Sequence, residues 1–218
     1  MAIKKLPIDL LMFDFDGTLA DSIPPAIEAI QKMMAKLGLP PKSKAEIHHF
    51  VGFGEVPLVS GAIGSSEPAF VAKAMALYYQ YYVNEGFKKI VLYPHVQEIL
   101  EFYKDKIKVI VSNKRDEFIT GILDNFKLTS SFDHIYGGDT APCLKPDPCT
   151  LIKVMKEYKI KPERSLFVGD MTVDIETGQN AGTHTCAVTF GFDNREKLKA
   201  AKPDFLIDDI IELRGIIE

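Results

Sequence analysis

Residues 8–20 read IDLLMFDFDGTLA: an apolar run interrupted by Asp9 is followed by Asp14, Asp16 and a glycine. The run from Ile8 to Phe13 is short and apolar on both faces, which is typical of a strand in a parallel sheet covered by helices. In open sheets of this kind, ligands bind beyond the carboxyl ends of the strands. The stretch therefore predicts a buried strand that delivers Asp14 and Asp16 to one edge of a sheet.

Further short apolar runs follow, and helical patterns lie between them. The runs rich in Val, Ile, Leu and Phe cover residues 107–111, 134–136, 165–168, 185–188 and 205–207. Helical patterns cover residues 94–104, 115–126, 147–158 and 173–180. This alternation predicts an α/β fold with a doubly wound, Rossmann-like parallel sheet as its core.

A long segment after the first strand breaks this alternation. Residues 20–89 contain no convincing strand, and apolar residues recur there at helical spacing over 23–37 and from 68 to about 83. We therefore expect two domains. An α/β core would comprise residues 1–19 and 90–218, and residues 20–89 would form an inserted helical domain.

Composition and charge narrow the class of protein. The chain has 218 residues, of which 46% are hydrophobic and 26% charged, and its formal net charge is −4. It has no long basic run, so we expect no nucleic-acid partner. No stretch approaches the length of a membrane span, and the first apolar run is too short for a signal peptide. We expect a cytoplasmic protein with no membrane partner; the sequence leaves its oligomeric state, monomer or dimer, open.

Three cysteines are present, at positions 143, 149 and 186. The count is odd and no CxxC spacing occurs, which argues against a disulfide framework. We expect unpaired thiols in a reducing compartment.

The Asp14–Asp16 pair is suited to phosphate chemistry. One carboxylate can attack phosphorus as a nucleophile. The other can protonate a leaving alkoxide and later deprotonate a water molecule. On its own, the pattern equally fits an Asp-Gly turn with a helix-capping aspartate.

A second acidic group follows the run at 165–168. Asp170 and Asp174 are four residues apart, so a helix that starts here places them on one side. Clustered oxygen ligands suit Mg²⁺. Helix capping by an aspartate is the alternative, and for this motif alone it is the better one.

Two further signals follow other runs. Ser112 and Asn113 come directly after residues 107–111, and a hydroxyl and backbone N–H groups at such a turn can hold phosphate oxygens. Lys145 precedes a proline, and its ammonium group could stabilise phosphate charge in a transition state. Lys114 could attract an anionic substrate. For Ser112 and Asn113 the alternative role is helix capping, and for the two lysines it is simple solvation. Because four signals coincide at strand ends, we favour a shared site.

These motifs resemble those of the haloacid dehalogenase-like (HAD) superfamily, and most closely its phosphoglycolate phosphatase branch. The resemblance covers nearly the whole chain. It is carried by residues 14–22 (DFDGTLADS), 136–139 (YGGD), 145–148 (KPDP), 168–170 (VGD) with Asp174, and 180–182 (NAG).

The resemblance implies a role for each motif residue. Asp14 would be the nucleophile, Asp16 the general acid/base, and Lys145 would link the nucleophile and the phosphate. Mg²⁺ would be held by Asp14, Asp170, the backbone carbonyl of Asp16 and, in support, Asp174. Substrate would be bound by Thr18, which orients the first loop, together with Ser112, Asn113 and Lys114. The helical domain would be a mobile cap over the site.

We therefore expect a Mg²⁺-dependent phosphatase that hydrolyses a small phosphomonoester through an aspartyl-phosphate. Asp16 favours phosphoryl transfer, since a halide leaving group needs no proton. Residues 51–58 look like the cap loop of phosphoglycolate phosphatases. Three alternatives remain open: a phosphatase for a sugar phosphate, nucleotide or pyrophosphate; a β-phosphoglucomutase-like phosphotransferase; and a non-catalytic phosphate-binding or phospho-acceptor module.

Overall fold

The computed structural model describes residues 5–218. The chain divides into two compact units, one made of Met1–Ala20 with Leu92–Glu218 and the other of Asp21–Val91. The first is an α/β unit and the second is helical. The two-stranded pair β2 (Ala20–Asp21) and β3 (Val91–Leu92) forms where the chain passes between the units.

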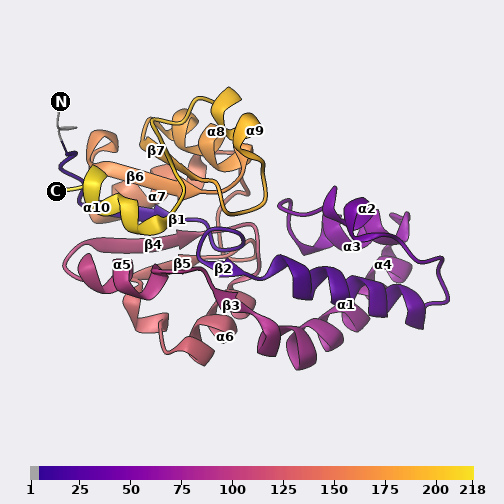
Figure 1. Ribbon diagram of the computed structural model, residues 1–218. Helices are drawn as coiled ribbons and strands as arrows, with labels where there is room; N and C mark the ends of the chain where they lie inside the picture. The colour runs from indigo at the N-terminus through magenta and orange to yellow at the C-terminus, as the bar shows by residue number, and fades with distance from the viewer. Residues whose placement is uncertain (1–4) are drawn as a thin grey trace. The chain divides into compact units, whose positions relative to one another are not determined.

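The α/β unit contains a six-stranded parallel sheet in the order β5-β4-β1-β6-β7-β8 (Figure 1). This confirms the predicted α/β class and doubly wound sheet. The strands are β1 (Leu10–Phe13), β4 (Ile107–Val111), β5 (His134–Tyr136), β6 (Ser165–Gly169), β7 (His184–Val188) and β8 (Phe205–Ile207). Each of the six predicted runs forms one of these strands.

Strand β1 lies in the middle of the sheet, between β4 and β6. Phe13 is in register with Ile110 of β4 and with Val168 of β6. All four residues of β1 are completely buried, as expected for a strand covered on both faces. The residues after β1 therefore emerge at the centre of the sheet's carboxyl edge.

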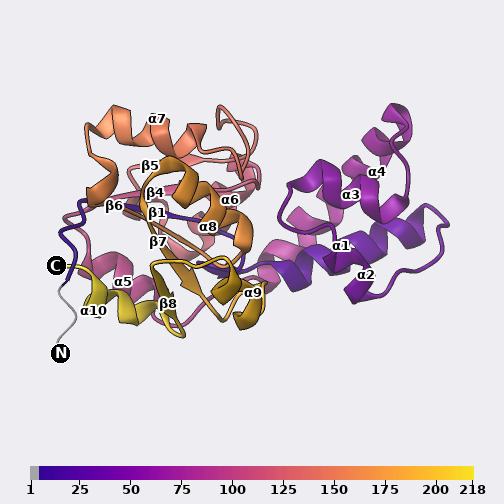
Figure 2. The same ribbon diagram turned by 90° about the horizontal axis from the view of Figure 1, so that it is seen from above.

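Helices cover both faces of the sheet. Figure 2 shows α7 on one side of the sheet and α5 and α10 on the opposite side. On the α7 side, Leu151 and Val154 pack with Leu10 and Met12 of β1. The helices of this unit are α5 (Val96–Phe102), α6 (Asp116–Phe126), α7 (Cys149–Tyr158), α8 (Thr172–Ala181), α9 (Arg195–Ala200) and α10 (Leu213–Ile216).

The helical unit consists of α1 (Ile23–Lys36), α2 (Lys44–His48), α3 (Glu55–Ile63) and α4 (Pro68–Tyr81). The patterns at 23–37 and 68–83 correspond to α1 and α4, and α4 is followed by a π-helical turn over Tyr82–Gly86. Tyr78 and Tyr82 are buried, and their rings stack 5.4 Å apart. Helix α3 was missed: part of residues 51–58, interpreted as a loop, is the start of α3, with Gly54 (φ +94°) as its N-cap.

The prediction about the cysteines was wrong for two of the three. Cys143 and Cys149 are joined by a disulfide, and only Cys186 is a free thiol. The odd count and the missing CxxC spacing could not reveal this pair, because the intervening segment folds back and brings the two Cα atoms to 6.1 Å. Across residues 5–218, no helix combines the length and the apolar character that a membrane span requires.

Candidate active site

Four loops at the carboxyl edge of the sheet carry the predicted residues. β1 leads to Asp14, β4 to Ser112, β6 to Asp170, and β5 to the segment that contains Lys145. The Asp14 N–H donates to the Val168 carbonyl at 2.9 Å, which continues the β1–β6 pairing into the loop. Parallel strands bring these loops to one edge because all of them point the same way.

Asp14, Lys145 and Asp174 form a buried charged cluster. Lys145 Nζ lies 2.8 Å from Asp14 Oδ1 and 2.5 Å from Asp174 Oδ1. All three residues are at most 6% exposed. One ammonium group thus bridges carboxylates that are 160 residues apart in the chain.

Asn113 holds the backbone of Lys145 rather than pointing freely into solvent. The Lys145 N–H donates to Asn113 Oδ1 at 2.9 Å, and Asn113 Nδ2 donates to the Lys145 carbonyl at 3.2 Å. These two bonds fasten the Lys145 segment to the loop after β4. Ser112 is buried beside it, and its N–H donates to the Tyr136 carbonyl at 3.0 Å.

Lys114 lies against the second aspartate of the first loop. Its Nζ is 3.0 Å from Asp16 Oδ1 and 3.2 Å from Asp16 Oδ2. The Lys114 side chain is only 5% exposed, whereas that of Asp16 is 25% exposed. Asp16 is therefore held by a buried cation and still reaches solvent.

Gly17 allows the loop after β1 to pack closely against Asp170. It has φ +82°, and a Cβ placed there would lie 2.2 Å from Asp170 Oδ2, so no other residue fits without displacement. The neighbouring Thr18 Oγ1 donates to Asp170 Oδ1 at 2.9 Å. The loops after β1 and β6 are thus packed tightly together.

The loop after β7 supports Asp170 from another side, and the sequence interpretation missed it. The Phe192 N–H donates to Asp170 Oδ2 at 2.6 Å, and a Cβ on Gly191 would lie 2.3 Å from Asp170 Cβ. Asp193 is buried and accepts from the Thr172 N–H at the start of α8. The available signal was a Gly-Phe-Asp sequence shortly after an apolar run, since that position also lies at the carboxyl edge of the sheet.

Burial and the interactions between neighbouring charges shift the pKa values of the ionisable groups in the site. Burial raises the pKa of Asp14 to about 6, against the attraction of Lys145. Burial and the nearby Asp174 and Asp14 charges raise the pKa of Asp170 well above its ordinary value. Burial acts to lower the pKa of Lys145, but the charges of Asp14 and Asp174 outweigh it and raise that pKa. The carboxylates together carry more negative charge than one lysine balances.

Two groups of side chains in residues 5–218 have the spacing of metal ligands. Asp14, Asp170 and Asp174 each offer a carboxylate oxygen, and these oxygens lie within 4.8 Å of one another. All three residues are buried. The other group, Cys143, Asp147 and Cys149, is partly exposed and includes the disulfide.

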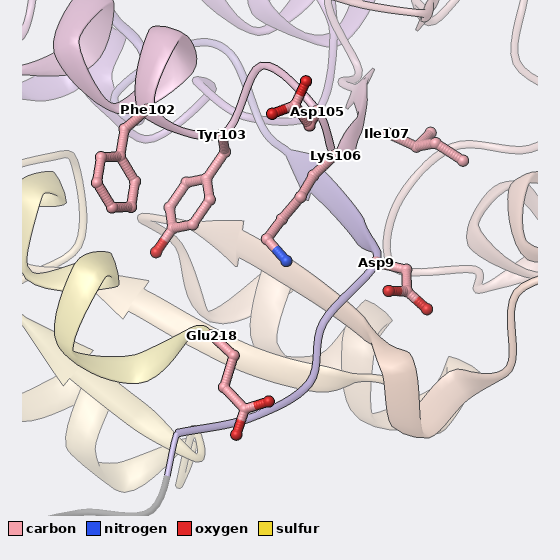
Figure 3. A pocket seen from close by; sticks show the side chains of 7 residues that line it. All are labelled: Asp9, Phe102, Tyr103, Asp105, Lys106, Ile107 and Glu218. Atoms are coloured by element: carbon pink, nitrogen blue, oxygen red, sulfur yellow. The ribbon is translucent and has the colours of Figure 1, made fainter.

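A separate surface pocket of about 420 Å³ lies at the other end of the strands. Figure 3 shows its lining, which includes Asp9 before β1, Lys106 before β4 and Glu218 at the chain end. It contains none of the predicted site residues. The structure therefore places those residues in the loops at the carboxyl edge and away from this pocket.

Comparison with known proteins identifies the family of this chain. Residues 11–188 match the model of the haloacid dehalogenase-like hydrolase family. A phosphoglycolate phosphatase from Pseudomonas putida is 34% identical over 92% of this chain and 76% of its own length. A phosphoglycolate phosphatase from Vibrio cholerae is 33% identical over 96% of this chain and 97% of its own. The crystal structure of a predicted phosphoglycolate phosphatase from Haemophilus somnus superposes with a TM-score of 0.90 at 27% identity, covering 95% of this chain and 97% of that one.

With its parallel sheet, buried aspartates and matching family model, the chain belongs to the haloacid dehalogenase-like hydrolases. It is a phosphoric monoester hydrolase. Within the family it lies in the phosphoglycolate phosphatase-like branch.

Proposed function

We propose that the protein is a Mg²⁺-dependent phosphatase for a small phosphomonoester of the phosphoglycolate type, acting through an aspartyl-phosphate at Asp14. The observation that carries the proposal is the buried Asp14 carboxylate at the end of the central strand, 2.8 Å from Lys145 Nζ. A carboxylate so placed is shielded from water and has a cation beside it, which suits attack on a charged phosphate.

The residues present fit a bound Mg²⁺. Among residues 5–218, Asp14 Oδ1 is a buried oxygen without a well-directed hydrogen bond, although Lys145 lies close. Burial first, and the neighbouring carboxylates second, raise the pKa values of Asp14 and Asp170, and a cation bound between them would favour their charged forms. Hard oxygen donors of this kind suit Mg²⁺. Asp14, Asp170 and the Asp16 carbonyl would hold the ion, with Asp174 in support. When bound, it would supply positive charge against the phosphate oxygens.

In the first half of the reaction, a carboxylate oxygen of Asp14 attacks phosphorus. The bond between phosphorus and the ester oxygen breaks, and Asp16 gives its proton to the departing alkoxide. Lys145 offsets the repulsion between the Asp14 carboxylate and the phosphate dianion. Asn113 keeps Lys145 in reach through its two hydrogen bonds to the lysine backbone.

In the second half, Asp16 takes a proton from a water molecule that attacks the phosphorus of the aspartyl-phosphate. The bond between phosphorus and Asp14 breaks, which releases inorganic phosphate and restores both carboxyl groups. Lys114, within 3.2 Å of both Asp16 oxygens, orients this side chain for both proton transfers. Thr18 and Ser112 are proposed to line the phosphate site.

Similarity to proteins named phosphoglycolate phosphatases supports a short, anionic phosphomonoester as substrate. A substrate carboxylate and phosphate would together bring several negative charges, which the buried lysines Lys114 and Lys145 match. The helical unit Asp21–Val91 is proposed as the cap that selects the substrate and excludes water during the reaction.

A panel of phosphomonoesters tests this proposal through inorganic phosphate release in Mg²⁺. The panel includes phosphoglycolate, sugar phosphates, nucleotides and pyrophosphate, ranked by kcat/KM. We expect phosphoglycolate to rank first, and Asp14→Asn to abolish turnover of every substrate. Asp9→Asn is the matched control, because Asp9 precedes the same strand at its opposite end and pairs with Arg164. Turnover by Asp14→Asn at the wild-type rate would refute the proposed nucleophile.

A further inference from the structure

The disulfide between Cys143 and Cys149 encloses the lysine of the proposed site. The two cysteines are six positions apart, and Lys145 lies between them. The enclosed segment reads CLKPDPC over residues 143–149. It runs from the loop after β5 to the first residue of α7. The bond thus closes a small covalent ring whose backbone includes Lys145, which contacts both Asp14 and Asp174.

Apart from Lys145, the ring lies mostly at the surface. Leu144 is 43% exposed, and Pro146 and Asp147 are also exposed. Its ends are tied by polar contacts as well: Thr150 Oγ1 donates to the Cys143 carbonyl at 2.9 Å, and the Cys149 N–H donates to Asp147 Oδ1 at 2.9 Å. An exposed segment has little packing to hold it, so a covalent link between its ends limits its motion.

The two linked cysteines are suited to exchange with a small disulfide. Both are partly exposed, in contrast to the buried Cys186 of β7. Cys149 is the first residue of α7, and the amino-terminal end of a helix stabilises a thiolate, the form that attacks disulfides. No local sequence pattern distinguishes these two thiols from Cys186.

We propose that Cys143 and Cys149 form a reversible redox site, a proposal that rests on the proposed function of Lys145. Its disulfide fastens the Lys145 segment in the arrangement that reaches Asp14 and Asp174. Reduction removes the covalent link between the two ends of the segment, so that only non-covalent contacts, chiefly the two hydrogen bonds between Asn113 and the Lys145 backbone, keep Lys145 in position. The oxidised enzyme is therefore the faster one, and a reducing environment slows it.

The exchange partner is a low-molecular-weight disulfide such as oxidised glutathione. The Cys149 thiolate attacks one of its sulfurs, which forms a mixed disulfide and expels one glutathione thiolate. The Cys143 thiolate then attacks the Cys149 sulfur and expels the second. Two protein thiols are oxidised to one disulfide, one glutathione disulfide is reduced to two thiols, and the two protons pass to the glutathione thiolates.

Counting free thiols in the full-length protein tests the site without any activity measurement. The protein is equilibrated in oxidised glutathione or in dithiothreitol, alkylated under denaturing conditions, and its intact mass measured. We expect wild type to carry two fewer alkyl groups after oxidation, with residues 143 and 149 joined in the peptide map. Cys186→Ser should likewise carry two fewer alkyl groups after oxidation, whereas Cys143→Ser should form no intramolecular disulfide. An unchanged thiol count in wild type would overturn the redox site.

The link to Lys145 is tested by kcat in the same two buffers. We expect reduction to lower kcat of wild type and of Cys186→Ser by about tenfold, since a small misplacement of a positioning group costs up to about 10²-fold. Cys143→Ser and Cys149→Ala, checked for folding by circular dichroism, should give one low kcat in both buffers. Equal kcat values for oxidised and reduced wild type would overturn the link.

Two other outcomes are separable. Absence of phosphatase activity in both buffers would count against the proposed function, while the thiol count would still decide the redox site. Asp147 lies with the two cysteines in ligand spacing, so reduced protein is also dialysed against zinc chloride and its zinc content measured. One tightly held zinc ion, lost in Cys143→Ser, would identify a metal site and overturn the redox proposal.

Discussion

Replacing the proposed nucleophile should make the metal-free protein more stable while it abolishes turnover. Asp14 is 4% exposed, and its burial raises its pKa from 3.8 to about 6 despite the attraction of Lys145. Each tenfold change in a protonation equilibrium is worth about 1.4 kcal/mol, so the charged form costs the folded state about 3 kcal/mol. Asn has the same shape and no charge. Asp14→Asn should therefore raise the free energy of unfolding by up to about 3 kcal/mol at pH values at which Asp14 is ionised in the wild type.

The sign of the pH dependence follows from the raised pKa. The folded protein binds the Asp14 proton more tightly than the unfolded chain does. This contribution to stability is fully present below the unfolded value of 3.8 and is lost as the pH rises through about 6. The stability difference between Asp14→Asn and wild type should therefore be largest at about pH 8 and shrink toward about pH 4.

Urea unfolding with a chelator, followed by circular dichroism because the chain has no tryptophan, measures this difference. Asp9→Asn is the control with the opposite sign: its hydrogen bond to Arg164 lowers the pKa of Asp9, and losing an exposed pair should cost at most about 1 kcal/mol. Added Mg²⁺ should stabilise wild type and leave Asp14→Asn nearly unchanged. A metal-free Asp14→Asn protein less stable than wild type at about pH 8 would refute the reasoning.

Four further outcomes are expected. Chelation should remove phosphate release and added Mg²⁺ restore it, measured as kcat against Mg²⁺ concentration; activity without any divalent ion would contradict the metal site. Asp16→Asn should lower kcat by about 10²–10⁴-fold, and a burst of product or trapped phosphoenzyme would show which half-reaction is slowed. Gly17→Ala, whose Cβ would lie 2.2 Å from Asp170 Oδ2, should lower stability by about 1–3 kcal/mol and weaken Mg²⁺ binding, both measurable by calorimetry. Asn113→Ala should lower kcat more than it raises KM in steady-state kinetics, because it frees the Lys145 backbone.

Local sequence patterns were sufficient to predict most strands and helices of the α/β unit. The run before Asp14 is apolar on both faces, which is typical of a strand covered by helices on both sides. The six runs therefore predicted the six strands, and the alternation with helices predicted a parallel sheet. Helix α3 was missed because Gly52 and Gly54 indicate a turn, while the helix that begins at Glu55 depends on packing within the helical unit.

The sequence by itself determined which residue types stand at the strand ends, because local apolar runs and the positions that follow them are read directly along the chain. Only the tertiary structure decided their partners. The pairing of Asp16 with Lys114, the support of Asp170 by the loop after β7, and the disulfide around Lys145 all join segments whose contact depends on how the chain folds back. The physical reason is that such contacts are set by sheet order and loop path, which no local pattern encodes.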